Sequence, residues 1–326
     1  MIKSLFRIGL PLIDVLLVLP LLLAGIVMKA FRRIGAGRLP RSKACLMWLG
    51  VFPIRDHYYE PMFHPRHLRH ALKDERELPG IDWNEVGQVG LLEQINFSAE
   101  IVGHWDKPGA PPQFYINNGG FEAGDAEYWY SIVRHFKPSR IIEIGSGNST
   151  LVARQAIARN CEESSTYNCD HVCIEPYEAP WLESTGVRVL RSRVEDLEYS
   201  LFTALGENDI LFIDSSHVIR PQGDVLTEFL QILPKLAPGV VVHVHDIFSP
   251  RDYSSAAIIG EVSFWNEQYL LEAFLTHNHE WQIIGALNYL QHRHHDALKS
   301  VCPYLTKSRE PGSFYIRKQS RPEIRT

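Results

Sequence analysis

Two polar clusters that follow apolar runs hold the residues of this chain best suited to acid–base chemistry. In LFIDSSH, Asp214 follows three apolar residues and His217 comes three positions later; in PGVVVHVHDIF, His245 and Asp246 end a run of valines. A histidine titrates near neutral pH and can take a proton from a hydroxyl group, while a neighbouring carboxylate orients its ring. We therefore expect His217 or His245 to be a general base, with Asp214 or Asp246 as its partner.

Neighbouring strands must bring these two clusters together. Residues 209–213 and 240–244 each form a short apolar run that predicts a buried strand. Parallel strands in one sheet lie about 4.8 Å apart, so the residues that follow them meet at one edge. His243 shares a strand face with His245 but lies deeper, and we interpret it as a core residue.

A glycine turn precedes both clusters in the chain. The run IIEIGSGNST predicts a strand over 140–144, then Gly145 and Gly147, then a helix that opens at Ser149. Glycine lets the chain turn tightly and lets a ligand approach the backbone closely. Glu143 lies inside the apolar strand, where a buried carboxylate is costly unless it has a partner. The pattern indicates a ligand site at the carboxyl end of this strand.

Acidic residues follow the next two predicted strands. The strand over 171–174 ends in CIEP, and Glu175 at its tip is placed to accept hydrogen bonds from two ribose hydroxyls. After the strand over 187–190, Glu195 or Asp196 offers a further carboxylate at the same edge. These residues favour a nucleotide-type ligand.

Apolar strands that alternate with helices predict an α/β fold whose parallel sheet is covered on both faces. Helices are expected over 125–136, with Asp125 as the N-cap, and over 149–159, 224–236 and 264–274. Two late strands are expected over 281–286 and 313–317.

Taken together, E-I-G-S-G, the acidic tip of the second strand, LFIDSSH and PGVVVHVHDIF resemble the class I S-adenosylmethionine-dependent methyltransferases. The pattern is most similar to the small-molecule and sugar O-methyltransferase branch, and it covers about Gly120 to Arg317. The resemblance implies a Rossmann-like, seven-stranded sheet with an antiparallel last strand, which the two late strands would supply.

The resemblance also implies roles for individual residues. Glu143, Gly145 and Gly147 would line the methionine and ribose side of S-adenosylmethionine, and Ser149 stands where the family has its third glycine. Glu175 would hold the ribose, Glu195 or Asp196 would lie near the adenine, and Asp214 would lie beside the cofactor. Trp265, Asn266 and Tyr269 are expected to contact the acceptor, and the loop over 115–120 is a further candidate for ligand contact.

The implied activity is methyl transfer to a hydroxyl group of a glycan, a lipid-linked sugar or a small molecule. Some relatives of this family bind magnesium through paired acidic residues after the fifth strand. Here Asp246 is followed by Ile247, so the resemblance does not decide whether this chain needs a divalent cation. A non-catalytic module that binds an adenosyl ligand is the alternative. A nicotinamide-dependent dehydrogenase is disfavoured because the third glycine is missing and Glu175 comes 30 residues after Gly145.

Composition excludes several classes of protein. The 326 residues are 45% hydrophobic and carry a net charge of −5, which gives no reason to expect nucleic acid as a partner. Five cysteines read as free thiols in a reducing compartment. A zinc site from Cys161, Cys169, His171 and Cys173 is conceivable, but a loop followed by a strand is the favoured interpretation. Oligomeric state cannot be read from the sequence.

The N-terminus has the composition of a membrane anchor. From Ile8 to Met28 the only charged residue is Asp14, and this stretch is close to the length that spans a bilayer. The heavier basic flank follows it, which predicts membrane association with the catalytic domain in the cytoplasm. A cleaved signal peptide is the alternative, but no convincing cleavage site follows the apolar run. Pro11 and Pro20 would kink a spanning helix, so a bent or re-entrant anchor is a second alternative.

The sequence predicts three regions along the chain. Residues 1–43 are expected to be the anchor with its basic flank, 44–112 a helical extension or lid, and 113–326 the methyltransferase domain. Within the extension, helices are expected over 69–77 and within 83–97. His64, His67 and His70 recur every third residue, and we interpret them as a solvated helix entry.

Overall fold

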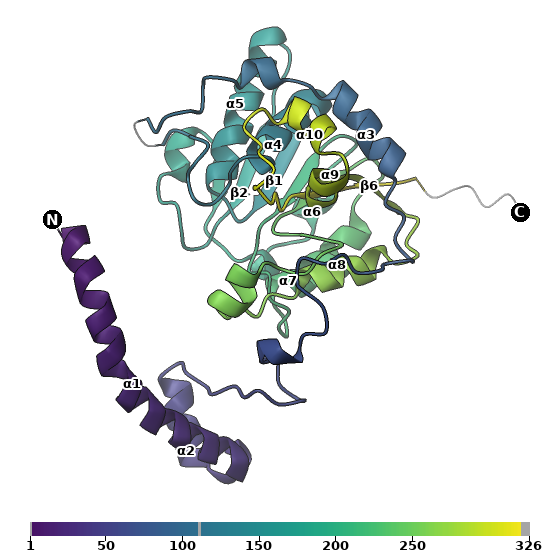
Figure 1. The fold of residues 1–326 in the computed structure, drawn as a ribbon. Helices are drawn as coiled ribbons and strands as arrows, with labels where there is room; N and C mark the ends of the chain where they lie inside the picture. The colour runs from purple at the N-terminus through teal and green to yellow at the C-terminus, as the bar shows by residue number, and fades with distance from the viewer. Residues whose placement is uncertain (1, 110–111, 321–326) are drawn as a thin grey trace, which may run out of the picture. The chain divides into compact units, whose positions relative to one another are not determined.

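The computed structural model describes residues 2–109 and 112–320 (Figure 1). Its contacts divide the chain into two compact units, one up to Arg69 and one from His70 onward, and each is described by itself.

The larger unit is built on a seven-stranded sheet in the order β3-β2-β1-β4-β5-β7-β6. The strands are β1 Arg140–Ile144, β2 Asp170–Ile174, β3 Arg188–Leu190, β4 Ile210–Ile213, β5 Val241–Val244, β6 Trp281–Ala286 and β7 Phe314–Lys318. β1 to β5 pair in parallel, and β7 lies between β5 and β6, antiparallel to both. This is the Rossmann-like sheet with an antiparallel last strand that the sequence predicted.

Burial and register explain why polar residues meet at one edge. Every residue of β4 and β5 is buried, so both faces of the sheet are covered, as expected for an apolar parallel sheet. Ile144 pairs with Ile213, and Ile213 pairs with Val244. The next residues of these three strands, Gly145, Asp214 and His245, therefore emerge side by side.

Helices and tight turns connect the strands. In the larger unit they are α3 Glu85–Gln94, α4 Asp125–Phe136, α5 Asn148–Glu163, α6 Ser200–Thr203, α7 Asp224–Thr227, α8 Glu267–Leu275, α9 Leu287–Arg293 and α10 His295–Val301. The predicted helix over 224–236 forms as α7, a π-helical turn over Glu228–Ile232 and a 3-10 turn over Leu233–Lys235. The prediction of Asp125 as the N-cap of α4 is wrong: Gly124 is the N-cap, and Asp125, the first residue of the helix, accepts a hydrogen bond from the Ser313 amide instead.

The predicted helix over 69–77 is wrong. Tertiary contacts take the polar groups that a helix would use: the Arg76 amide donates to the carbonyl of Pro250, and its guanidinium binds Glu272. Asp74 instead accepts a hydrogen bond from the Ala71 amide at 3.0 Å, which closes a local turn. The helix predicted within 83–97 is confirmed as α3.

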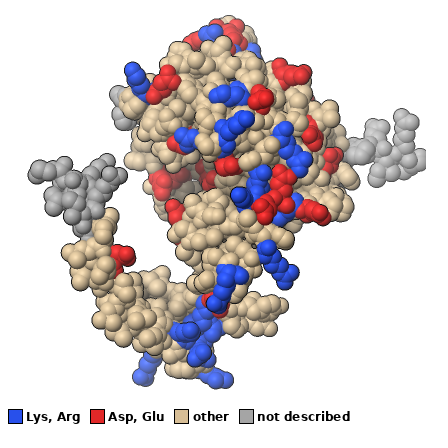
Figure 2. Space-filling view, viewed as in Figure 1, with Lys and Arg blue, Asp and Glu red and all other residues tan. Residues whose placement is uncertain are grey.

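The smaller unit contains α1 Ile2–Ile34, a 3-10 turn over Ala36–Arg38 and α2 Pro40–Trp48. The helix α1 continues through Pro11 and Pro20. Its stretch Leu10–Ile34 has 25 residues and contains an 18-residue window with a mean hydropathy of 2.6, none of which is buried, so its length and composition suffice to cross a membrane. Figure 2 shows this stretch as mostly uncharged, with Lys and Arg gathered toward its far end.

Candidate active site

The turn after β1 requires glycine at its first position. Gly145 has φ +76°, and a Cβ on it would lie 1.8 Å from the backbone oxygen of Asp214. Its amide donates to the carbonyl of Ile174 at 3.0 Å, which ties the turn to β2. A Cβ on Gly147 would meet nothing within 4 Å, because that residue faces open space. The two glycines of the motif therefore have different reasons to be glycine.

Glu143 lies beneath this turn. The side chain is fully buried, and its Oε2 accepts a short hydrogen bond from the Thr150 hydroxyl, which in turn accepts one from the Gly147 amide at 3.2 Å. His171 and Cys173 on β2 approach the same carboxylate at 3.4 and 3.6 Å. Glu143 thus contacts the turn through Thr150 and does not line the neighbouring cavities.

Glu175 follows β2, and one of its carboxylate oxygens can still accept hydrogen bonds from a ligand. Its Oε1 accepts hydrogen bonds from the amides of Tyr177 and Glu178 at 2.9 and 2.8 Å, which fixes the side chain. Within the described part of the chain, its Oε2 accepts only a long bond, 3.4 Å, from the Ser146 amide. A carboxylate oxygen in that state can still accept hydrogen bonds from hydroxyl groups of a ligand.

Two adjoining cavities lie along this edge of the sheet. One has a volume of about 590 Å³ and the other about 440 Å³, and both are lined by Gly145, Glu175, Glu178 and Asp214. Glu195 lines the larger cavity, within 4.0 Å of Arg193 and Arg220, whereas Asp196 does not. Gly119, Gly120, Phe121, Ser149, His245 and Asp246 line the smaller one.

His217 is surrounded by three carboxylates. Its Nδ1 lies 2.8 Å from Glu267, and its Nε2 lies 3.4 Å from Asp214 and 3.5 Å from Asp246. Burial by itself lowers the pKa of this imidazole, but the hydrogen bonds to Asp214 and Glu267 outweigh it and raise the pKa well above its usual value. Trp265 packs on the ring at 4.7 Å between centroids.

His245 faces the smaller cavity directly. It is 7% exposed, its Nδ1 has no hydrogen-bond partner among the described residues, and Phe121 packs on its ring. Burial lowers the pKa of His245, but the nearby carboxylates, Asp214 first, outweigh this and raise it. His243 is fully buried among aromatic rings, and burial holds its pKa well below its usual value. Only His245 of this pair can meet a ligand.

Sequence reasoning missed two buried carboxyl groups behind His217. Glu267 is the first residue of α8 and is fully buried, as is Glu228 at the start of the π-helical turn, which accepts a hydrogen bond from Ser215 at 3.0 Å. Burial raises the pKa of both carboxyl groups. The sequence carries no local signal for them, because Glu267 opens a helix that also contains Glu272, and Glu228 lies in a turn that also contains Gln231.

The acceptor contacts expected from the sequence lie outside the two cavities. Asn266 accepts a hydrogen bond from the Ile219 amide at 2.6 Å, and the Tyr269 hydroxyl donates to Asp252 at 3.0 Å. Trp265 packs against His217. Their contact with an acceptor stays a prediction.

Among the described residues, two groups of side chains have the composition and spacing of metal ligands. Asp214, His217 and Asp246 each offer a donor atom within 4.8 Å of the others, at the edge of the smaller cavity. Glu143, His171 and Cys173 form the second group, inside the core. The structure thus groups His171 and Cys173 with Glu143, and all five cysteines are free.

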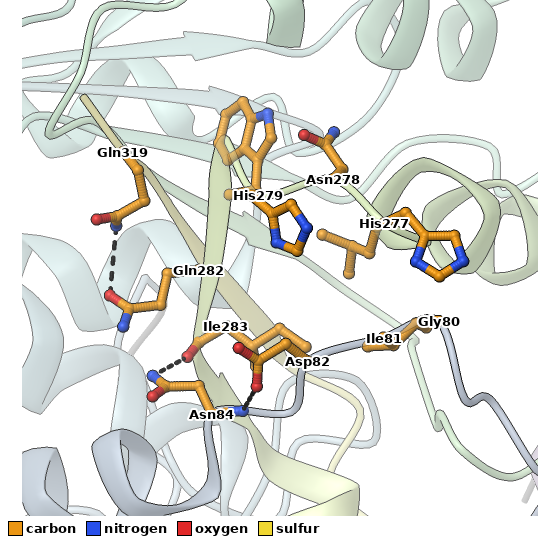
Figure 3. Close-up of a pocket in the computed structure, with 12 residues that line it drawn as sticks. Gly80, Ile81, Asp82, Asn84, His277, Asn278, His279, Gln282, Ile283 and Gln319 are labelled. Carbon is orange, nitrogen blue, oxygen red and sulfur yellow. Dashed lines mark hydrogen bonds between the residues drawn. The ribbon is translucent and has the colours of Figure 1, made fainter. Parts of the chain in front are cut away.

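A further pocket of about 180 Å³ lies at the start of β6, on the opposite edge of the sheet from the two cavities (Figure 3). His277, His279 and Gln282 are among the residues that line it. Because β6 runs parallel to β5, its first residue, Trp281, lies at the edge of the sheet opposite His245. We assign the chemistry to the strand-tip cavities, where carboxylates and histidines converge.

Two solved structures superpose loosely on this chain. The plantazolicin methyltransferase BpumL, in complex with a triazolic desmethylPZN analog and SAH, has 13% identity and a TM-score of 0.34 over 60% of this chain and 84% of its own. The MycE methyltransferase from the mycinamycin biosynthetic pathway, in complex with Mg, SAH and mycinamycin VI, has 16% identity and a TM-score of 0.35 over 63% and 52%. At these scores we base no argument on them.

Residues 142–247, which run from β1 past the end of β5, match the family described as "Methyltransferase domain". An uncharacterized protein of Archaeoglobus fulgidus is 30% identical over 178 residues, which are 49% of this chain and 76% of that protein. This chain therefore belongs to the same family as the archaeal protein, and its residues 142–247 are similar to a methyltransferase domain.

Proposed function

We propose that this chain transfers the methyl group of S-adenosylmethionine to a hydroxyl oxygen of a glycan, a lipid-linked sugar or a small molecule. One observation carries the proposal: the glycine turn, the Glu175 and Asp214 carboxylates and His245 all line two adjoining cavities. A ligand in the larger cavity would present its far end to His245 in the smaller one.

The residues at this edge fit an adenosyl ligand. Glu175 keeps an oxygen available for ribose hydroxyls, Glu195 lines the far side of the larger cavity, and the turn over Gly145 and Gly147 lets a ligand approach the backbone. Asp214 and Ser149 complete the lining. When bound, the cofactor supplies an electrophilic methyl group on a sulfonium.

The chain's own part in the reaction is to hold the acceptor in line and to remove its proton. Alignment lowers the entropic part of the barrier, and a base removes the hydroxyl proton as the oxygen forms its bond to carbon. His245 faces the cavity, whereas His217 stands behind Asp214 and Asp246. We propose that His245 takes the proton, because both ring nitrogens of His217 already face carboxylates, which raise its pKa well above its usual value.

A divalent cation is a further element of the proposal. Asp214, His217 and Asp246 would hold it, since two carboxylates and an imidazole form a suitable donor set at the edge of the cavity. When bound, it would lower the pKa of the acceptor hydroxyl.

We also propose that α1 attaches the enzyme to a membrane, with the methyltransferase domain in the cytoplasm. The apolar stretch Leu10–Ile34 and the basic residues after Met28 support this orientation. Attachment would bring the enzyme close to membrane-bound acceptors.

Calorimetric titration with S-adenosylmethionine and its demethylated product tests the cofactor. We expect binding of both, and the absence of heat from folded protein would refute the proposal. Incubation of labelled cofactor with membrane and soluble extracts then shows which fraction accepts the methyl group. Binding without transfer to either fraction would favour the non-catalytic module.

His217→Ala and His245→Ala separate the two candidate bases. Loss of the base should lower turnover by about 100-fold or more while the affinity for the cofactor is kept. A repeat with added magnesium and with a chelator tests the cation. If both variants kept full turnover, the proposed proton transfer would be wrong.

A further inference from the structure

The segment over residues 46–63 exposes an unusual number of large apolar side chains. Nine such side chains are exposed in this stretch, among them Trp48 at 84%, Tyr58 at 90% and Tyr59 at 84%. Large contiguous apolar surface on a folded protein marks a site that contacts another molecule or a membrane. We call residues 46–63 the aromatic segment.

Specific contacts fasten the aromatic segment to the last turns of α1. Arg32 binds Glu60 at 2.7 Å, and Arg55 binds the same carboxylate at 2.8 Å. Phe52 packs edge-on against Phe31, with ring centroids 6.0 Å apart, and the Arg32 guanidinium lies over its ring. The aromatic segment is thus held near the C-terminal end of α1.

The length of α1 sets the depth of that end in a bilayer. The run Leu10–Met28 carries one charged residue, Asp14, and at 1.5 Å per residue its 19 residues are about 28 Å long, close to the thickness of the hydrocarbon core, about 30 Å. Lys29, Arg32 and Arg33 follow this run, so the last turns of α1 lie in the headgroup region when the run spans the core. Tryptophan and tyrosine concentrate at this depth, because their rings are apolar while their N–H and O–H groups form hydrogen bonds with water or headgroups.

Basic side chains surround the same end. Five basic side chains are exposed in the last two turns of α1, the following 3-10 turn and α2: Lys29, Arg33, Arg38, Arg41 and Lys43. Figure 2 shows blue side chains gathered at this end of the N-terminal unit. Each basic residue near an anionic membrane surface contributes about 1 kcal/mol of attraction. The basic residues and the aromatic segment thus both fit an anionic membrane surface as the partner.

We propose that the aromatic segment is a second membrane-contacting element, which lies in the headgroup region of the leaflet where α1 ends, beside basic residues that contact lipid phosphates. The inference rests on the membrane attachment proposed above. It assigns residues 46–63 to the lipid surface, whereas the sequence placed them in a helical lid.

Quenching by brominated lipids tests the depth of Trp48. It is the only one of the seven tryptophans that precedes residue 83, so the difference in emission between the wild type and Trp48→Phe reports on it alone. The full chain is placed in vesicles of phosphatidylcholine and phosphatidylglycerol, brominated either near the headgroup or near the chain end. We expect stronger quenching of Trp48 by the shallow bromines, and more of it when phosphatidylglycerol is present.

Controls separate this inference from the proposals on which it rests. Trp181→Phe in the larger unit should leave the quenched component unchanged. If the protein floats with vesicles but Trp48 is not quenched, the aromatic segment is not in the membrane while the anchor stands. If the protein does not float, both fail. Titration of the same sample with S-adenosylmethionine tests the enzyme independently of either result.

Discussion

Gly145→Ala should destabilise the methyltransferase domain while Gly147→Ala should not. At Gly145 a Cβ would lie 1.8 Å from the carbonyl oxygen of Asp214, and the residue is held at φ +76°. The unfavourable backbone conformation costs about 1–2 kcal/mol and the forced shift of β4 about 1–3 kcal/mol. For a domain of this size, their sum of about 2–5 kcal/mol corresponds to a fall in Tm of roughly 10 °C.

Thermal unfolding of the two variants with and without S-adenosylmethionine is the assay. Gly147→Ala meets nothing within 4 Å in the protein, so its Tm without ligand should equal that of the wild type. If a ligand approaches the backbone there, this variant should lose the ligand-induced rise in Tm even though it is folded. Equal Tm values for Gly145→Ala and the wild type would refute the reasoning about the β1 turn.

Three further variants probe the site and its support. Glu175→Gln can keep the hydrogen bonds from the amides of Tyr177 and Glu178 but removes the charge. It should weaken cofactor binding about 10-fold or more in calorimetry. Glu267→Gln should lower kcat with little change in cofactor affinity, because Glu267 fixes the His217 ring from behind; an unchanged kcat would argue against this. Burial raises the pKa of Glu127 to about 7 from 4.5. The folded state therefore keeps a proton that the unfolded state releases, and about 3 kcal/mol of stability should be lost as pH rises from 4.5 past 7. Glu127→Gln should flatten that slope in urea unfolding between pH 5 and 8.

Strands and their polar tips could be predicted because they depend on local patterns. Each central strand is a run of four or five mostly apolar residues, and the polar residue that ends it must lie at the edge of the sheet. The predicted helix over 69–77 failed for the opposite reason. Its polar groups bind partners nearly 200 residues away in the chain, such as Glu272 with Arg76, and no local pattern reveals such a partner.

The same limit explains why Glu267 escaped the sequence analysis. It stands 50 residues after His217, and only the folded chain brings its carboxylate to 2.8 Å from Nδ1. A histidine and an aspartate after two apolar strands could be recognised as a pair, because strand pairing alone places them together. The third member comes from a helix whose position depends on packing against the π-helical turn over Glu228–Ile232.

The backbone at the strand tips shows how this convergence is achieved. His217 has φ +58° and Asp246 has φ +55°, both in the left-handed region that residues other than glycine seldom adopt. Each such residue costs about 1 kcal/mol or more and persists only where the surroundings determine it. Both conformations turn the chain sharply after a strand, and they leave the His217 imidazole 3.5 Å from the Asp246 carboxylate. Strain at two positions, each costly for folding, is thus found where three carboxylates meet one histidine, as expected where function rather than stability selects the geometry.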